Sequence, residues 1–202
     1  MLTPNIDLQN KSILITGAAG FIGANLVMEL LQDTKAVKIV GLDSMCDYYD
    51  VSIKEYRLAE IDKIAKHKND SRWTFVKGSI ADRPLLERLF QENCFDLVVN
   101  LAAQAGVRYS ITNPDAYIES NLVGFYNILE ACRRHPVAHL VYASSSSVYG
   151  MNPKVPYAVE DPVDNPVSLY AATKKSNELM AHAYSKLYNI PSTGLRFFTV
   201  YG

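Results

Sequence analysis

The sequence predicts an α/β fold in which a doubly wound parallel sheet carries helices on both faces. Short, nearly continuous apolar runs recur along the chain, as is typical of strands buried on both faces of a parallel sheet. Segments with helical periodicity separate these runs, so strand and helix alternate throughout. A glycine-rich stretch from Gly17 to Gly23 directly follows the first run and indicates the strand-to-helix turn of a Rossmann-like domain.

Six apolar runs are expected to form the strands. They cover residues 13–16, 38–42, 73–76, 96–102, 139–144 and 193–198. The clearest helix is expected over residues 114–134, where apolar residues recur at spacings of four and three. Asn113 is expected to cap this helix, with Pro114 in its first turn.

The remaining segments complete the alternation. Further helices are expected over residues 21–33, within the charged stretch 44–70, after Asp82 and Pro84, and over residues 168–188. The proline-rich and acidic segment 151–167 is predicted to be a loop beside the functional site.

Composition limits the possible function. The 202 residues suit one large domain, 1–202, and the net charge of −1 without a basic block argues against nucleic-acid binding. No apolar run approaches the length needed to cross a bilayer, which predicts a cytoplasmic protein without a membrane partner. Three well-separated cysteines without a C-x-x-C pair favour reduced thiols and no metal site.

The glycine stretch is predicted to cradle phosphates. Gly17 permits a sharp turn out of the strand, Gly20 allows backbone to approach a pyrophosphate, and Gly23 allows the helix to pack closely. The spacing is G-x-x-G-x-x-G instead of the commoner G-x-G-x-x-G, so an ordinary strand-to-helix turn remains an alternative.

Asp43 ends the second strand, about twenty residues after the glycine stretch. A carboxylate there can accept both hydroxyls of an adenosine ribose and would repel a 2′-phosphate. No arginine follows it closely, which favours NAD over NADP. A strand-end aspartate that only starts a turn is the alternative.

Tyr170 and Lys174 lie four residues apart at the start of the last helix and share one face. An ammonium near the phenol is expected to lower the tyrosine pKa and make it a base. The serine run Ser144 to Ser147 ends the fifth strand, where ligands bind in open α/β sheets. Arg108 follows the fourth strand and could face an anionic substrate, although a surface ion pair is equally consistent.

Together these motifs resemble the extended short-chain dehydrogenase/reductases, in particular the NAD-dependent sugar-nucleotide epimerases and most narrowly the UDP-glucuronate 4-epimerases. The resemblance rests on the glycine stretch, Asp43, residues 100–110, 119–124, the serine run, residues 170–174 and residues 196–202. It therefore covers nearly the whole chain.

The resemblance implies NAD as the cofactor and a role for each matching residue. The cofactor would contact Gly17, Gly20, Phe21, Ile22, Asp43, Ser79, Ile80, Leu101, Ala102, Ala103, Tyr170 and Lys174. The catalytic residues would be Ser145, Tyr170 and Lys174, and the substrate would contact Ser145, Ser146, Tyr170, Thr199 and Arg108. Thr199 stands where related galactose epimerases carry asparagine, and would help to accept a sugar carboxylate.

The implied reaction is the 4-epimerisation of UDP-glucuronate to UDP-galacturonate through a 4-keto intermediate, in nucleotide-sugar metabolism and polysaccharide biosynthesis. Dehydratases and decarboxylases of this superfamily carry an acid just after the catalytic hydroxyl, and Ser146 and Ser147 lack it. UDP-glucuronate decarboxylation, 4-epimerisation of UDP-glucose or UDP-N-acetylglucosamine, and a non-catalytic NAD-binding module remain alternatives.

Two expectations concern assembly. Family members continue past the position of Gly202 into a smaller lobe that grips the uridine diphosphate, so the 202-residue chain alone is expected to hold NAD but to epimerise poorly. The family also implies a homodimer formed through the helices at 114–134 and 168–188.

Overall fold

One six-stranded parallel sheet organises the protein. The computed structural model describes residues 6–33, 37–67 and 71–201, and its strands lie in the order β3-β2-β1-β4-β5-β6. The strands are β1 (Ser12–Thr16), β2 (Lys38–Asp43), β3 (Trp73–Lys77), β4 (Leu97–Asn100), β5 (His139–Ser145) and β6 (Ser192–Phe197). All six predicted strands are confirmed, and each boundary agrees to within two residues.

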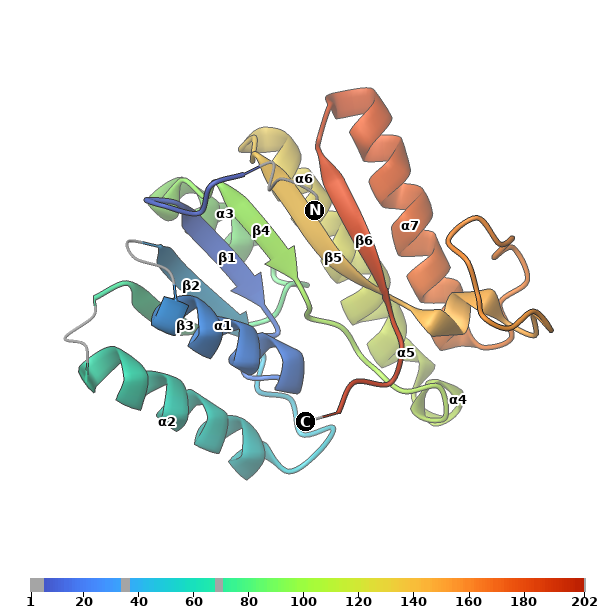
Figure 1. Cartoon of the computed structure of the whole chain (residues 1–202), viewed down its shortest axis with the longest axis horizontal. Coiled ribbons are helices and arrows are strands. Elements are labelled where there is room, and N and C mark those ends of the chain that lie inside the picture. Colours follow the sequence, from blue (N-terminus) through green and yellow to red (C-terminus); the bar gives the residue numbers. More distant parts are fainter. Residues whose placement is uncertain (1–5, 34–36, 68–70, 202) are drawn as a thin grey trace.

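Helices cover both faces of this sheet. They are α1 (Phe21–Asp33), α2 (Val51–His67), α3 (Arg83–Asn93), α4 (Tyr109–Thr112), α5 (Pro114–Tyr117), α6 (Phe125–Arg134) and α7 (Leu169–Tyr188), together with the π-helix η1 (Ile118–Gly124) and the 3₁₀ helix η2 (Ser146–Tyr149). Figure 1 shows α1 and α2 in front of the sheet and α3, α6 and α7 behind it. The doubly wound fold is therefore confirmed.

Strand β1 shows how both faces are filled. Side chains alternate along a strand, so consecutive residues reach opposite layers. Ile13 and Ile15 pack in the cluster formed with α1 and α2, whereas Leu14 packs in the cluster formed with α3, α6 and α7. All three are at most 2% exposed. Burial on both faces explains why the run is apolar without alternation.

The predicted helix over residues 114–134 is present but not uniform. Its middle is the π-helical segment η1, which separates α5 from α6. Pro114 lies in the first turn and Asn113 occupies the N-cap position as expected, but the Asn113 side chain makes no capping hydrogen bond. The Asn113 amide instead donates a hydrogen bond to the Tyr109 hydroxyl at 2.8 Å.

The strand order places the functional region. From β1 the chain moves outward to β2 and β3, and from β4 it moves the other way to β5 and β6. The connections that leave β1 and β4 therefore diverge, which opens a crevice at the carboxyl ends of these two strands.

Among the described residues, no helix is long and apolar enough to span a bilayer.

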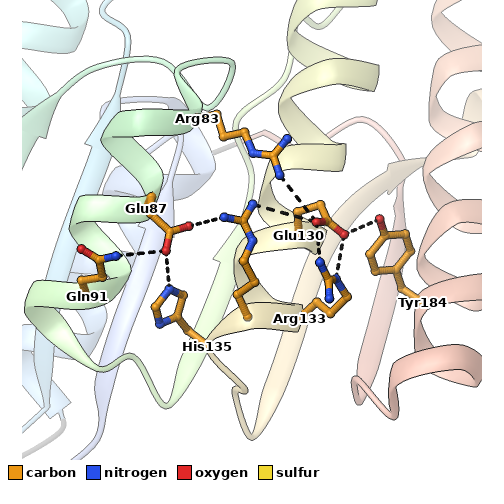
Figure 2. Close-up of polar contacts among 8 residues, drawn as sticks. Arg83, Glu87, Gln91, Glu130, Arg133, His135 and Tyr184 are labelled. Atoms are coloured by element: carbon orange, nitrogen blue, oxygen red, sulfur yellow. Dashed lines mark hydrogen bonds and ion pairs between the residues drawn. The ribbon is translucent and has the colours of Figure 1, made fainter.

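A network of ion pairs ties together the three helices behind the sheet (Figure 2). Glu130 on α6 is only 7% exposed and accepts hydrogen bonds from Arg133 at 2.9 and 3.0 Å and from the Tyr184 hydroxyl of α7 at 2.9 Å. Burial raises the pKa of Glu130, but the bonds from Arg133 and Tyr184 outweigh it and lower that pKa to about 2. On α3, Glu87 contacts Arg134, His135 and Gln91.

Glu130→Gln is expected to lower the free energy of unfolding by about 2 kcal/mol at pH 7, because it removes the buried charge that these donors surround. The folded-state pKa lies below the unfolded value of 4.5, so this contribution is present above pH 4.5 and is lost as the pH falls toward 2. Urea unfolding at pH 7 and pH 3 measures both effects. Glu92→Gln, at an exposed site on α3, is the control; equal unfolding curves for both variants would contradict the prediction.

Candidate functional site

A cavity of about 830 Å³ opens at the carboxyl ends of the strands. Thirteen of the predicted site residues line it: Gly17, Gly20, Phe21, Ile22, Asp43, Ser79, Ile80, Leu101, Ala102, Ala103, Ser145, Tyr170 and Lys174. The structure thus brings together every predicted cofactor and catalytic residue. Ser146, Thr199 and Arg108 are not among the residues that line the cavity, and the last two are exposed. Their contact with substrate stays a prediction.

The glycine turn between β1 and α1 forms the floor of the cavity. Gly17 has φ +70°, and a Cβ there would lie 2.8 Å from the backbone nitrogen of Ala102 on the neighbouring connection. A Cβ on Gly23 would lie 2.2 Å from the Gly17 carbonyl oxygen. Larger residues would therefore push the turn, the helix and the β4 connection apart. This geometry leaves the N-terminus of α1, whose first N–H groups lack partners within the helix, beside the cavity.

Asp43 lies at the next corner of the cavity and is 6% exposed. Its carboxylate accepts hydrogen bonds from the Ala19 N–H at 3.1 Å and the Met45 N–H at 2.8 Å, and forms an ion pair with Lys54 at 3.4 Å. Arg57 lines the same cavity. No arginine follows Asp43 closely along the chain, as the sequence indicated, and Arg57 reaches this cavity only through the fold of α2.

The connection after β3 forms the predicted adenine side. The Ser79 hydroxyl accepts a hydrogen bond from the Ala81 N–H at 3.1 Å, which closes a local turn. The Ile80 carbonyl accepts one from the Asn127 amide of α6 at 3.1 Å. Ile80 also packs closely against the end of η1, where a Cβ on Gly124 would lie 2.6 Å from the Ile80 side chain. This wall of the cavity is thereby fixed by α6.

Asn121 fixes the opposite wall, and sequence reasoning assigned it no role. Its side chain accepts a bond from the Gln104 N–H at 2.8 Å and donates to the Gln104 carbonyl at 3.0 Å and to the Thr173 hydroxyl at 3.1 Å. Its own carbonyl accepts a bond from the Asn177 amide at 2.6 Å. A π-helical turn frees backbone groups from the ordinary ladder, which suits this extra bond. The sequence feature that could have indicated this role is an asparagine within the helical segment 114–134, whose apolar residues recur at helical spacing.

Ser145 is the member of the serine run best placed for chemistry. Ser145 lines the cavity, and its Oγ accepts hydrogen bonds from the Ser147 N–H at 3.2 Å and the Ser147 hydroxyl at 2.9 Å, which leaves its own proton for the Tyr170 hydroxyl. Ser144 instead donates to Glu178 at 2.6 Å. That carboxylate is held by Arg196 in a two-bond pair at 2.9 and 3.0 Å.

Tyr170 and Lys174 project from the first turns of α7, whose N-terminus is capped by Ser168. Lys174 is 4% exposed and donates a hydrogen bond to the Ala143 carbonyl at 3.0 Å, and burial lowers its pKa to about 8. The expected lowering of the Tyr170 pKa is not found. Burial raises that pKa and a hydrogen bond with Ser145 only partly opposes it, while the ammonium of Lys174 is directed at a carbonyl.

Asn121→Leu is expected to lower the free energy of unfolding by about 3 kcal/mol, because it leaves buried backbone groups of Gln104 without partners. Hydrogen exchange at the Gln104 amide should accelerate together with this loss. Urea unfolding and hydrogen-exchange measurements would show both changes. Asn25→Leu is the control, since that exposed amide bonds only a carbonyl of its own helix; similar losses in both variants would refute the role of Asn121.

Comparisons with known proteins agree with this geometry. A family model described as the NAD dependent epimerase/dehydratase family matches residues 13–202. The protein CapI of Staphylococcus aureus is 56% identical over 94% of this chain and 54% of its own length. A UDP-glucuronate 4-epimerase of Arabidopsis thaliana is 48% identical over 95% of this chain and 42% of its own length.

A solved structure of UDP-glucuronic acid 4-epimerase from Bacillus cereus, in complex with UDP-glucuronic acid and NAD, superposes with a TM-score of 0.83 at 35% identity. It covers 95% of this chain and 57% of that one, so the chain spans about half the length of the relatives it matches. NAD fits the residues present, since the glycine turn, the N-terminus of α1 and the Asp43 carboxylate line one cavity. The chain therefore belongs to the NAD-dependent epimerase/dehydratase family.

Proposed function

We propose that this chain is the NAD-binding part of a cytoplasmic enzyme that converts UDP-glucuronate to UDP-galacturonate by epimerisation at C4. The observation that carries the proposal is the meeting of Ser145, Tyr170 and Lys174 at one end of the cavity, with no carboxylate at Ser146 or Ser147. Relatives named UDP-glucuronate 4-epimerase at 46–48% identity support this choice of sugar.

In this proposal Tyr170 removes the proton from the 4-hydroxyl of the sugar. NAD supplies a hydride acceptor when bound, and the sugar passes through a 4-keto intermediate before C4 is reduced from the other face. Ser145 can donate a hydrogen bond to the same sugar oxygen because its Oγ already accepts two bonds from Ser147. Lys174 lies one helical turn after Tyr170, and in this proposal its buried ammonium contacts the cofactor.

The sugar must be held so that both faces of C4 can be presented. Within the described residues, Ser146, Thr199 and Arg108 lie outside the cavity lining. Because the chain spans about half the length of its relatives, we propose that further segments of the intact protein bind the uridine diphosphate and bring the sugar to Ser145.

Tyr170→Phe is expected to reduce the conversion of UDP-glucuronate by the intact protein by about 10²–10⁴-fold, because it removes the group that moves the proton. Separation of the sugar nucleotides after incubation would measure the conversion. Tyr56→Phe, at an exposed site on α2, is the control and should keep the wild-type rate. An unchanged rate in Tyr170→Phe would remove the tyrosine from the mechanism.

The product distinguishes the alternatives. UDP-galacturonate supports the proposal, whereas a UDP-pentose with carbon dioxide indicates a decarboxylase. Conversion of UDP-glucose or UDP-N-acetylglucosamine, with UDP-glucuronate left intact, indicates an epimerase of neutral sugars. Binding of NAD without turnover of any of these sugars by the intact protein indicates a non-catalytic module.

We also propose that two copies of the protein pair through the layer behind the sheet. Exposed apolar side chains lie on the helices of this layer. Val123 is on η1, Tyr126 is on α6, and Leu179 and Leu187 are on α7. Leu179 and Leu187 are 59% and 70% exposed. A two-fold axis can cover one such face with the same face of a second copy.

Leu179→Glu in the intact protein is expected to convert the dimer to a monomer, because the interface would have to bury a carboxylate without a partner. Sedimentation equilibrium gives the mass directly. Val155→Glu, on the exposed loop before α7, is the control and should leave the dimer intact. A wild-type protein that sediments as a monomer would overturn the proposed pairing.

A further inference from the structure

Two cationic side chains stand behind Asp43 at the ribose corner of the cavity. Lys54 lies in the first turn of α2, and its ammonium is 3.4 Å from the Asp43 carboxylate and 3.5 Å from the Cys46 sulfur. Arg57 follows on the same side of α2. Its guanidinium contacts the Tyr49 hydroxyl at 3.1 Å and the Ala19 carbonyl at 3.5 Å. Both cations line the cavity.

The ammonium of Lys54 is buried but weakly bonded. Its side chain is only 5% exposed, and an ammonium has three N–H donors. Its contact with Asp43 is longer than an ordinary charge-assisted hydrogen bond of about 2.7–2.9 Å, and its second partner is a sulfur atom, a weak acceptor. Burial lowers the pKa of Lys54, but Asp43 and Cys46 outweigh it and the pKa lies above its ordinary value. A charged donor with spare capacity therefore borders the cavity.

The Asp43 carboxylate masks further donors at the same corner. Its two oxygens occupy the Ala19 N–H and the Met45 N–H. Arg57 contacts the carbonyl of Ala19, the residue whose N–H donates to Asp43. Without that carboxylate, two backbone N–H groups and two cations would face the same space.

We propose that Lys54 and Arg57 form a latent 2′-phosphate site that the Asp43 carboxylate masks. With Asp43 present, its negative charge repels a 2′-phosphate, and Lys54 donates to a ribose hydroxyl while Asp43 accepts from one. With the carboxylate removed, the corner holds two positive charges and no masking acid, which suits a phosphate dianion. Lys54 and Arg57 lie eleven and fourteen residues after Asp43 in the sequence, too far for the sequence alone to connect them with it. The fold of α2 brings both to the cavity that Asp43 lines.

The inference rests on the adenosine half of the cofactor, and the test therefore uses 5′-AMP and 2′,5′-ADP, which carry no nicotinamide. Binding to the nucleotide-free chain is measured by titration calorimetry. Asp43→Ser is expected to bind 2′,5′-ADP at least about tenfold more tightly than the wild-type chain does, and to bind 5′-AMP more weakly. Adding Lys54→Met or Arg57→Gln to Asp43→Ser should remove most of the gain. Lys66→Met, an exposed lysine on the same helix, should leave the gain unchanged.

Two further variants keep the test decisive if Asp43→Ser does not fold. Asp43→Asn preserves the size of the side chain and removes its charge, and should show a smaller gain for 2′,5′-ADP. Lys54→Met alone should weaken the binding of 5′-AMP several-fold.

The proposal is overturned if neither Asp43 variant gains affinity for 2′,5′-ADP, or if the gain survives the loss of both cations. These outcomes are independent of the sugar, because neither probe contains a sugar nucleotide. An intact protein that fails to convert UDP-glucuronate would leave this result unaffected.

Discussion

The close approach of the β1–α1 turn to the connection after β4 is the constraint on which the site depends. A Cβ on Gly17 would lie 2.8 Å from the Ala102 nitrogen, so the two diverging connections touch at the point where the strand order reverses. The Thr16 hydroxyl strengthens this junction, because it donates to Asn100 at 2.7 Å and accepts from the Ala102 N–H at 3.1 Å. The junction sets the distance between the phosphate cradle and the wall on which the nicotinamide would rest.

A second junction joins that wall to α7, the helix that carries the proposed base. Asn121 binds both backbone groups of Gln104 and also reaches Thr173, which lies between Tyr170 and Lys174 on α7. The π-helical η1 adds a further bond between these segments, since the Asn121 carbonyl accepts a hydrogen bond from Asn177 of α7. Hydrogen bonds from one side chain therefore tie the wall after β4 to the helix that carries the proposed base. A regular α-helix would have used that carbonyl in its own ladder.

The sequence was sufficient for the sheet but not for the electrostatics of the site. Strands buried on both faces need apolar residues throughout, and the glycine turn needs residues without Cβ, so both features are visible in local sequence. The environment of Asp43 is not local, because Lys54 reaches it only after α2 folds back over the corner. Likewise, the spacing of Tyr170 and Lys174 predicts a shared face but not that the Lys174 ammonium points to Ala143. Side-chain direction inside a packed layer depends on neighbours far away in sequence.

The buried lysine also has a cost that other parts of the fold must offset. Lowering the pKa of Lys174 from 10.5 to about 8 corresponds to about 3 kcal/mol of destabilisation while the side chain stays charged at pH 7. The carboxylate of Glu130, whose pKa falls from 4.5 to about 2, opposes this cost with a contribution of about 2 kcal/mol. Tyr184 connects that carboxylate to α7, the helix that carries Lys174. Helix α7 thus holds an unfavourable charge near its beginning, where the proposed chemistry uses it, and a favourable hydrogen bond to a carboxylate near its end, where it serves the fold.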